Sequence, residues 1–179
     1  PKALIASLAQ QATGKHVLIL AGDHHEVLSL FNDFAFFTER PVMEFPAWET
    51  MPNENIAPSP DIVGERYKVL EKVIDSEEPL ILVSNLQACL QKLIVPDQFL
   101  ELYLSLMVGE NVNFEKLVSK FKEMGYTRAN VAADKGEFAV RGGIIDIFPV
   151  GSPAPFRIEF WGDDIESIRT YDPIGQKSV

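Results

Sequence analysis

GEFAVRGGIIDIFP at residues 136–149 and PFRIEFWGDDIES at residues 155–167 predict the strands of one small antiparallel sheet. In the second stretch, apolar residues alternate with a charged and aromatic set, Arg157, Glu159 and Trp161. A period of two sends alternate residues to opposite faces of a strand, so the apolar set faces the core and the other set faces water. Packing gives Trp161 no reason to lie on that face, and an exposed Trp beside Arg is typical of a protein-binding hot spot. The stretch therefore predicts recognition rather than catalysis.

Residues 101–179 as a whole are predicted to form an α+β module with an antiparallel sheet. Apolar residues from Phe114 to Phe121 recur at helical spacing, with Asn113 as the N-cap and Gly125 as the stop. Two-residue and three-residue loops in the last hairpin each leave one unfavourable cross-strand pair, so its register stays open. Strands are expected at residues 102–108, 138–140, 144–148, 156–161 and 165–171.

Residues 1–100 are predicted to form a separate α/β domain, because buried strands alternate there with amphipathic helices. This alternation is typical of a parallel sheet that is covered on both sides. Residues 46–60 are too rich in Pro and Asn for regular structure, so a long ordered loop is expected there. Strands are expected at residues 16–21, 42–45 and 79–83, the first of them central. Helices are expected to start at the capping residues Asp23, Ser59 and Ser84.

The composition excludes several classes of function. The net charge of the 179 residues is −10, and both portions of the chain are acidic. Binding of nucleic acid needs a dense basic surface, so this chain is a poor candidate for it. The single Cys89 excludes an internal disulfide, and no apolar run approaches the roughly 20 residues that span a bilayer. We expect a cytoplasmic setting without membrane contact.

Several short motifs have structural explanations. Thr13-Gly14-Lys15 precedes a strand instead of following one and lacks the other residues of a phosphate loop, and no GxGxxG occurs. The adjacent His24 and His25 point about 100 degrees apart in a helix, which does not suit a metal. Asp163 and Asp164 fit a turn, and Asp146 fits an ion pair with an arginine such as Arg141. We therefore expect no catalytic residue, cofactor or metal site.

Two motifs and two rival functions stay open. The glycines of Arg141-Gly142-Gly143 are expected to permit a bend between strands, and Trp48 is expected to plug the sheet edge or to contact a partner. A nucleotide-binding hydrolase with an unfamiliar phosphate site is one rival. The other is a platform for single-stranded nucleic acid in which Trp161 stacks on bases.

The two stretches that open this section, together with FPAWETMPNENIAPSPDIVGERYKVL at residues 45–70, carry a family resemblance. The chain resembles the amino-terminal part of the bacterial transcription-repair coupling factors. Its second portion also resembles the interaction domain of the excision-repair protein UvrB. UvrB would show a phosphate loop near its amino end and a hairpin insertion after the Pro-rich loop, and this sequence has neither.

The resemblance implies a degenerate helicase-like domain at residues 1–100 and a UvrA-binding domain at residues 101–179. It also implies that Arg141, Arg157 and Trp161 contact UvrA. The family often has Phe at the last of these positions, so Trp161 keeps an aromatic anchor with an altered fit. The full-length protein would be an ATP-dependent and Mg-dependent translocase on double-stranded DNA that displaces stalled RNA polymerase and recruits nucleotide excision repair. The parts that bind ATP, DNA and polymerase would lie outside this chain.

Overall fold

The computed structural model describes residues 2–50, 54, 56–101, 103–175 and 177–178. The chain forms two compact units, Pro1–Leu93 and Ile94–Val179. The sequence places the boundary after Leu100, whereas the structure places it after Leu93. The structure thereby assigns the short helix α5 (Pro96–Glu101) to the second unit.

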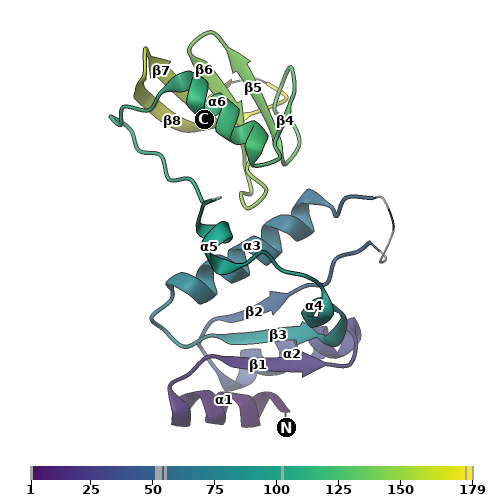
Figure 1. Ribbon diagram of the computed structural model, residues 1–179. Coiled ribbons are helices and arrows are strands. Elements are labelled where there is room, and N and C mark those ends of the chain that lie inside the picture. The colour runs from purple at the N-terminus through teal and green to yellow at the C-terminus, as the bar shows by residue number, and fades with distance from the viewer. Residues whose placement is uncertain (1, 51–53, 55, 102, 176, 179) are drawn as a thin grey trace. The chain divides into compact units, whose positions relative to one another are not determined.

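The first unit is built on a parallel sheet with the strand order β1-β3-β2 (Figure 1). The prediction that the first strand is central is wrong, because β3 lies between the other two. Both faces of β3 are packed, whereas Leu18 and Leu20 of β1 are 55% and 51% exposed. The elements of the first unit are α1 (Lys2–Thr13), β1 (Val17–Ala21), α2 (His24–Phe37), β2 (Val42–Phe45), α3 (Pro60–Asp75), β3 (Ile81–Asn85) and α4 (Leu86–Leu90).

Helices cover both faces of this sheet, as the alternating pattern predicts (Figure 1). α1 and α2 bury Ala3, Val27 and Phe34 against one face. α3 and α4 bury Val69 and Ala88 against the other. The result is two cores, one on each side of the strands.

The helix caps are formed largely as predicted. The side chains of Asp23 and Ser59 accept hydrogen bonds from backbone N–H groups of α2 and α3. The predicted cap of α4 is wrong, because Asn85 caps this helix while the Ser84 hydroxyl donates to the carbonyl of Phe45. The described residues between Pro46 and Ser59 contain no helix or strand, and residues 51–53 and 55 of the predicted loop lie outside the described part.

The second unit is a mixed sheet in the order β4-β5-β6-β7-β8-β9, with α6 against one face. The expected antiparallel pairs are present, and β4 adds a short parallel pair with β5. The strand expected at residues 102–108 is wrong for its described part, because residues 103–107 have no regular structure. The elements are α6 (Phe114–Glu123), β4 (Thr127–Arg128), β5 (Glu137–Arg141), β6 (Ile144–Ile147), β7 (Phe156–Trp161), β8 (Asp164–Asp172) and β9 (Lys177–Ser178).

Two tight turns set the register of this sheet. Gly142 and Gly143 connect β5 to β6, and a Cβ at Gly143 would lie 2.8 Å from the carbonyl oxygen of Phe160. The glycines thus form the bend that the sequence predicts. Gly162 and Asp163 connect β7 to β8, and the register shifts at Glu159/Phe160. Of the two loop lengths that the sequence leaves open, the structure therefore has the two-residue loop, together with this shift in register.

Candidate protein-interaction surface

The sheet of the second unit has an apolar inner face, packed against α6, and a polar face that we call the outer face. The inner face carries Phe138, Ile145, Ile158 and Phe160 in one core with Leu117 and Phe121 of α6. Because side chains alternate along each strand, the residues between them point the other way. The outer face comprises Ala139, Arg141, Ile144, Asp146, Arg157, Glu159, Trp161, Asp164, Ser167, Arg169 and Tyr171.

Trp161 is the exposed aromatic of the outer face. It ends β7, directly opposite Asp164, and 76% of its surface is exposed. The indole therefore lies on the face of the sheet that the alternation in the sequence predicts. An exposed indole holds a large apolar area ready for burial and has few rotors to order on binding. These properties of Trp161 would suit an anchor for a docking protein.

Arg157 has a different environment from the one that the sequence suggests. Its Nε and Nη2 donate to the two carboxylate oxygens of Asp146 at 2.7 and 2.8 Å, and its side chain is only 14% exposed. The bonds to Asp146 raise the pKa of the guanidinium. The guanidinium also lies 4.9 Å from the centroid of the Tyr171 ring. Arg157 is thus a half-buried residue of the outer face whose guanidinium serves the structure.

Arg141 is exposed at the end of β5, where its Nη2 donates to the carbonyl of Asn130 at 2.8 Å. Asp146 pairs with an arginine, as the sequence predicts, but the partner is Arg157 and not Arg141, the example considered there. The register places Asp146 opposite Arg157 and Arg141 opposite Ile144, at the turn. Of the two arginines singled out from the sequence, Arg141 is therefore the one whose charge reaches solvent.

A second ion pair lies next to Trp161 on the outer face. Nη2 of Arg169 is 2.5 Å from Oε2 of Glu159, and the Ser167 hydroxyl donates to the same oxygen at 2.8 Å. These bonds, the one from Ser167 foremost, lower the pKa of Glu159. Arg169 lies directly opposite Arg157, and each guanidinium has its own carboxylate. The charges on these strands are therefore largely paired.

Tyr171 is a buried aromatic residue of the outer face, and the sequence analysis does not single it out. The ring is buried, and its hydroxyl donates to the carbonyl of Ala132 at 2.7 Å. Burial raises the pKa of this hydroxyl to about 12, with a further contribution from the charge of Asp146. Together with the bond from Arg141 to Asn130, this contact holds the segment before β5 against the sheet. The signal in the sequence that could have identified Tyr171 is an aromatic residue among the outward-facing positions of β8.

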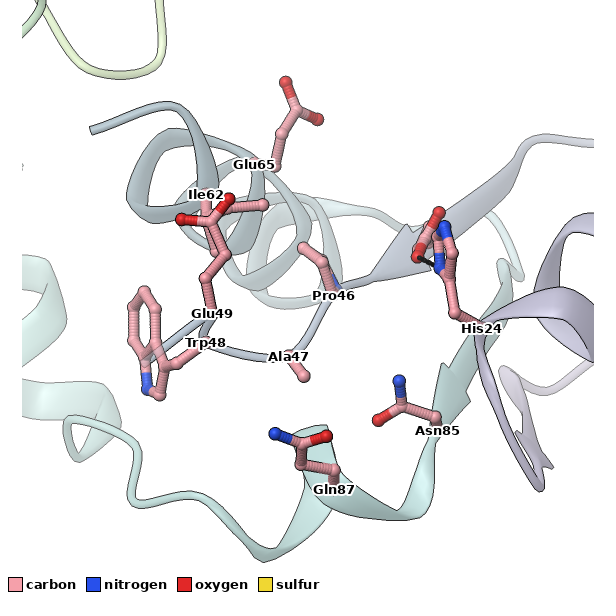
Figure 2. A pocket seen from close by; sticks show the side chains of 10 residues that line it. His24, Pro46, Ala47, Trp48, Glu49, Ile62, Glu65, Asn85 and Gln87 are labelled. Atoms are coloured by element: carbon pink, nitrogen blue, oxygen red, sulfur yellow. Dashed lines mark ion pairs between the residues drawn. The ribbon is translucent and has the colours of Figure 1, made fainter. Parts of the chain in front are cut away.

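The first unit contains a pocket of about 550 Å³ at the carboxyl ends of β2 and β3 (Figure 2). This edge is where parallel sheets often bind nucleotides. Figure 2 shows the carboxylates of Glu49 and Glu65 across the pocket from the amide of Gln87. The lining also includes Glu44, which lies 3.5 Å from Nδ1 of His24. Three carboxylates repel phosphate, so this pocket does not favour a nucleotide.

The start of α2 leads to the same conclusion. Phosphates commonly bind at the first N–H groups of a helix that follows a strand. Here the carboxylate of Glu26 accepts a hydrogen bond from the N–H of Gly22, and Lys2 pairs with Glu26. Asp23 accepts from the N–H of Glu26. Side chains of the chain itself thus occupy the place that a phosphate would take.

Trp48 packs on a buried arginine. The guanidinium carbon of Arg66 lies 4.1 Å from the ring centroids of both Trp48 and Phe45. Arg66 is fully buried, and its Nη1 donates to the carbonyl of Pro46 and to the side chain of Gln91. Trp48 therefore covers a cation beside the sheet edge, which agrees with the plugging role considered from the sequence.

Across the described residues, no group of three or more His, Cys, Asp or Glu side chains is placed to hold a metal ion. Among these residues, none of the helices is long and apolar enough to cross a bilayer.

Comparison with known proteins identifies the family. The UvrB interaction domain matches residues 104–179. The transcription-repair-coupling factors of Mycobacterium tuberculosis and Escherichia coli are 34% and 30% identical to this chain over 178 and 177 residues. These alignments cover 96% and 98% of this chain but only 14% and 15% of the relatives. The chain is therefore homologous to the transcription-repair-coupling factors over almost its whole length, and its residues 104–179 belong to the UvrB interaction domain family.

Proposed function

We propose that this chain recruits UvrA and thereby links a transcription-repair-coupling factor to nucleotide excision repair. The observation that carries the proposal is the exposed indole of Trp161 on a sheet that belongs to the UvrB interaction domain family. UvrA would bind the outer face through Trp161 and Arg141. Arg157 would act on this contact chiefly by holding the strands beneath it, because its guanidinium is engaged with Asp146.

The wider role follows the family and reaches beyond this chain. The relatives are named transcription-repair-coupling factors, and the chain spans about 15% of their length. A full-length relative of this kind would use ATP and Mg to translocate on double-stranded DNA and to displace RNA polymerase. The domain at residues 1–100 would be a degenerate helicase-like domain. All of this would take place in the cytoplasm.

Titration calorimetry of the chain with purified UvrA tests the proposal. Trp161→Ala should weaken binding roughly thirtyfold, which corresponds to about 2 kcal/mol for a hot-spot residue. Trp161→Phe should keep most of the affinity because it preserves an aromatic anchor. Phe36→Ala is the matched control, since Phe36 is 84% exposed but lies on α2 of the first unit. If Trp161→Ala binds UvrA as tightly as the wild type, the proposal is wrong.

The rival functions have less support. A nucleotide-binding hydrolase would need a phosphate site, but the pocket is lined by carboxylates and the start of α2 is occupied by Glu26. A platform for single-stranded nucleic acid would need excess positive charge around Trp161. Glu159 and Asp164 lie beside it instead, in a chain of net charge −10.

A further inference from the structure

The last hairpin carries two adjacent aspartates, and the structure gives them different environments. Asp163 serves the fold, because its carboxylate accepts the N–H of Phe114 at 2.9 Å and the side-chain amide of Asn113 at 3.1 Å at the start of α6. Asp164 is exposed at the start of β8. The sequence treats both as turn residues, and only Asp163 is held in this way.

The carboxylate of Asp164 lies at the surface. Oδ1 accepts a hydrogen bond of 2.6 Å from the side chain of Asn111, which is neutral. Among the residues that the structure describes, none of the salt bridges involves Asp164. A protein that docks over this carboxylate must remove water from it. That step costs free energy unless the partner supplies a cation or hydrogen-bond donors.

Asp164 belongs to the same surface as the proposed anchor. It lies directly opposite Trp161, and cross-strand neighbours project from the same face of a sheet. Arg141 lies at the same end of the sheet, because the turns after β5 and β7 meet where the N–H of Phe160 donates to the carbonyl of Gly143. β6 and β7 separate β5 from β8, so Arg141 and Asp164 are about 14 Å apart at the usual strand spacing.

We infer that Asp164 is a specificity-determining residue of this surface and pairs with a lysine or arginine of the docked repair partner. The inference rests on the proposed function, since it concerns the same face. The surface presents a cation at Arg141, an apolar anchor at Trp161 and an anion at Asp164. It therefore fits a partner that has an apolar pocket with an acidic group on one side and a basic group on the other. A partner without the basic group would leave Asp164 buried and unpaired.

Binding of UvrA to charge variants tests this inference. Asp164→Asn should weaken binding about threefold, as expected for loss of one partly exposed ion pair. Asp164→Lys should weaken it about tenfold or more, because it places like charges against each other. Both effects should shrink as the salt concentration rises. Glu123→Lys makes the same change of net charge on an exposed residue of α6, which covers the opposite face, and should leave binding unchanged.

Asn111→Ala separates the charge of Asp164 from its hydrogen bond. This variant removes the donor to Asp164 and leaves the carboxylate in place, so binding should stay within about twofold of the wild type. If Asn111→Ala weakens binding as much as Asp164→Asn does, the hydrogen bond matters rather than the charge and the inference fails. It also fails if Asp164→Lys binds as tightly as the wild type while Trp161→Ala binds weakly. That last result would leave the proposed function intact, whereas full binding by Trp161→Ala would overturn the proposed function itself.

Discussion

Arg157 and Asp146 lie directly opposite each other on β7 and β6 and share two hydrogen bonds, from Nε to Oδ1 and from Nη2 to Oδ2. Asp146 is only 2% exposed, and within the described part of the chain the guanidinium of Arg157 is the cation that its carboxylate contacts. Removing one member of such a pair leaves the other buried and uncompensated. The pair thus ties the stability of the second unit to a residue that the family resemblance assigns to binding.

Arg157→Met should lower the free energy of unfolding by about 3 kcal/mol, because it leaves the Asp146 carboxylate buried without a cation. Urea denaturation followed by circular dichroism measures this loss. Arg169→Met is the matched control, since the Arg169–Glu159 pair is far more exposed and its loss should cost less than about 1 kcal/mol. Equal losses in the two variants would contradict an internal role for Arg157.

The turn between β5 and β6 allows a prediction about two neighbouring glycines. Gly143→Ala should cost about 2 kcal/mol, because the added Cβ would lie 2.8 Å from the carbonyl oxygen of Phe160. Gly142→Ala should cost about 1 kcal/mol, since Gly142 has a φ of 59° and open space around it. Thermal unfolding of both variants gives the comparison. A Gly143 variant that is no less stable than the Gly142 variant would show that the strands relax apart without cost.

The sequence predicts well those features of the fold that depend only on residues close together in the chain, such as helix caps. Asp23, Ser59 and Asn113 cap helices as expected, because an N-cap needs only a side-chain oxygen and an N–H a few residues later. The sequence does not predict helix α1, since this helix buries the small or polar residues Ala3, Ala6, Ser7 and Gln10 and therefore shows little apolar periodicity. The sequence predicts less well those features that depend on contacts between distant parts of the chain, such as strand order.

On the outer face, too, the sequence predicts what local alternation determines but not what depends on the pairing of strands. Alternation within β7 suffices to place Trp161 on the outer face. The partner of Arg157 depends on the register between β6 and β7, which no short stretch of sequence contains. The central position of β3 likewise depends on where the chain returns after α3.

Tyr171 predicts how stability changes at alkaline pH. Its pKa rises from 10.0 to about 12 on folding, so the folded state keeps a proton that the unfolded state releases between these values. The stabilisation is complete below pH 10 and is lost as the pH rises toward 12. Tyr171→Phe should remove this part of the alkaline decline and cost about 1 kcal/mol at neutral pH, because the Ala132 carbonyl loses its donor. Urea denaturation at a series of pH values measures both effects. Identical slopes for wild type and variant above pH 10 would contradict the shifted pKa.

Arg66 gives a prediction for the first unit. The side chain is fully buried, burial lowers its pKa, and its Nε and Nη2 have no hydrogen-bond partner among the described residues. The rings of Phe45 and Trp48 offset part of the cost of this buried cation. Arg66→Met keeps much of the aliphatic volume and removes the charge, so it should be at least as stable as the wild type.

Arg66→Ala separates the contributions of volume and charge. It leaves a cavity between the two rings and should cost about 3 kcal/mol of unfolding free energy. In a Trp161→Phe background, Trp48 is the one tryptophan left, and its fluorescence reports on the packing against position 66 during urea denaturation. A methionine variant as unstable as the alanine variant would mean that the cation itself, through its ring contacts and its bonds to Pro46 and Gln91, holds the segment after β2. A stable methionine variant would instead mean that the aromatic rings need only a long side chain to pack against.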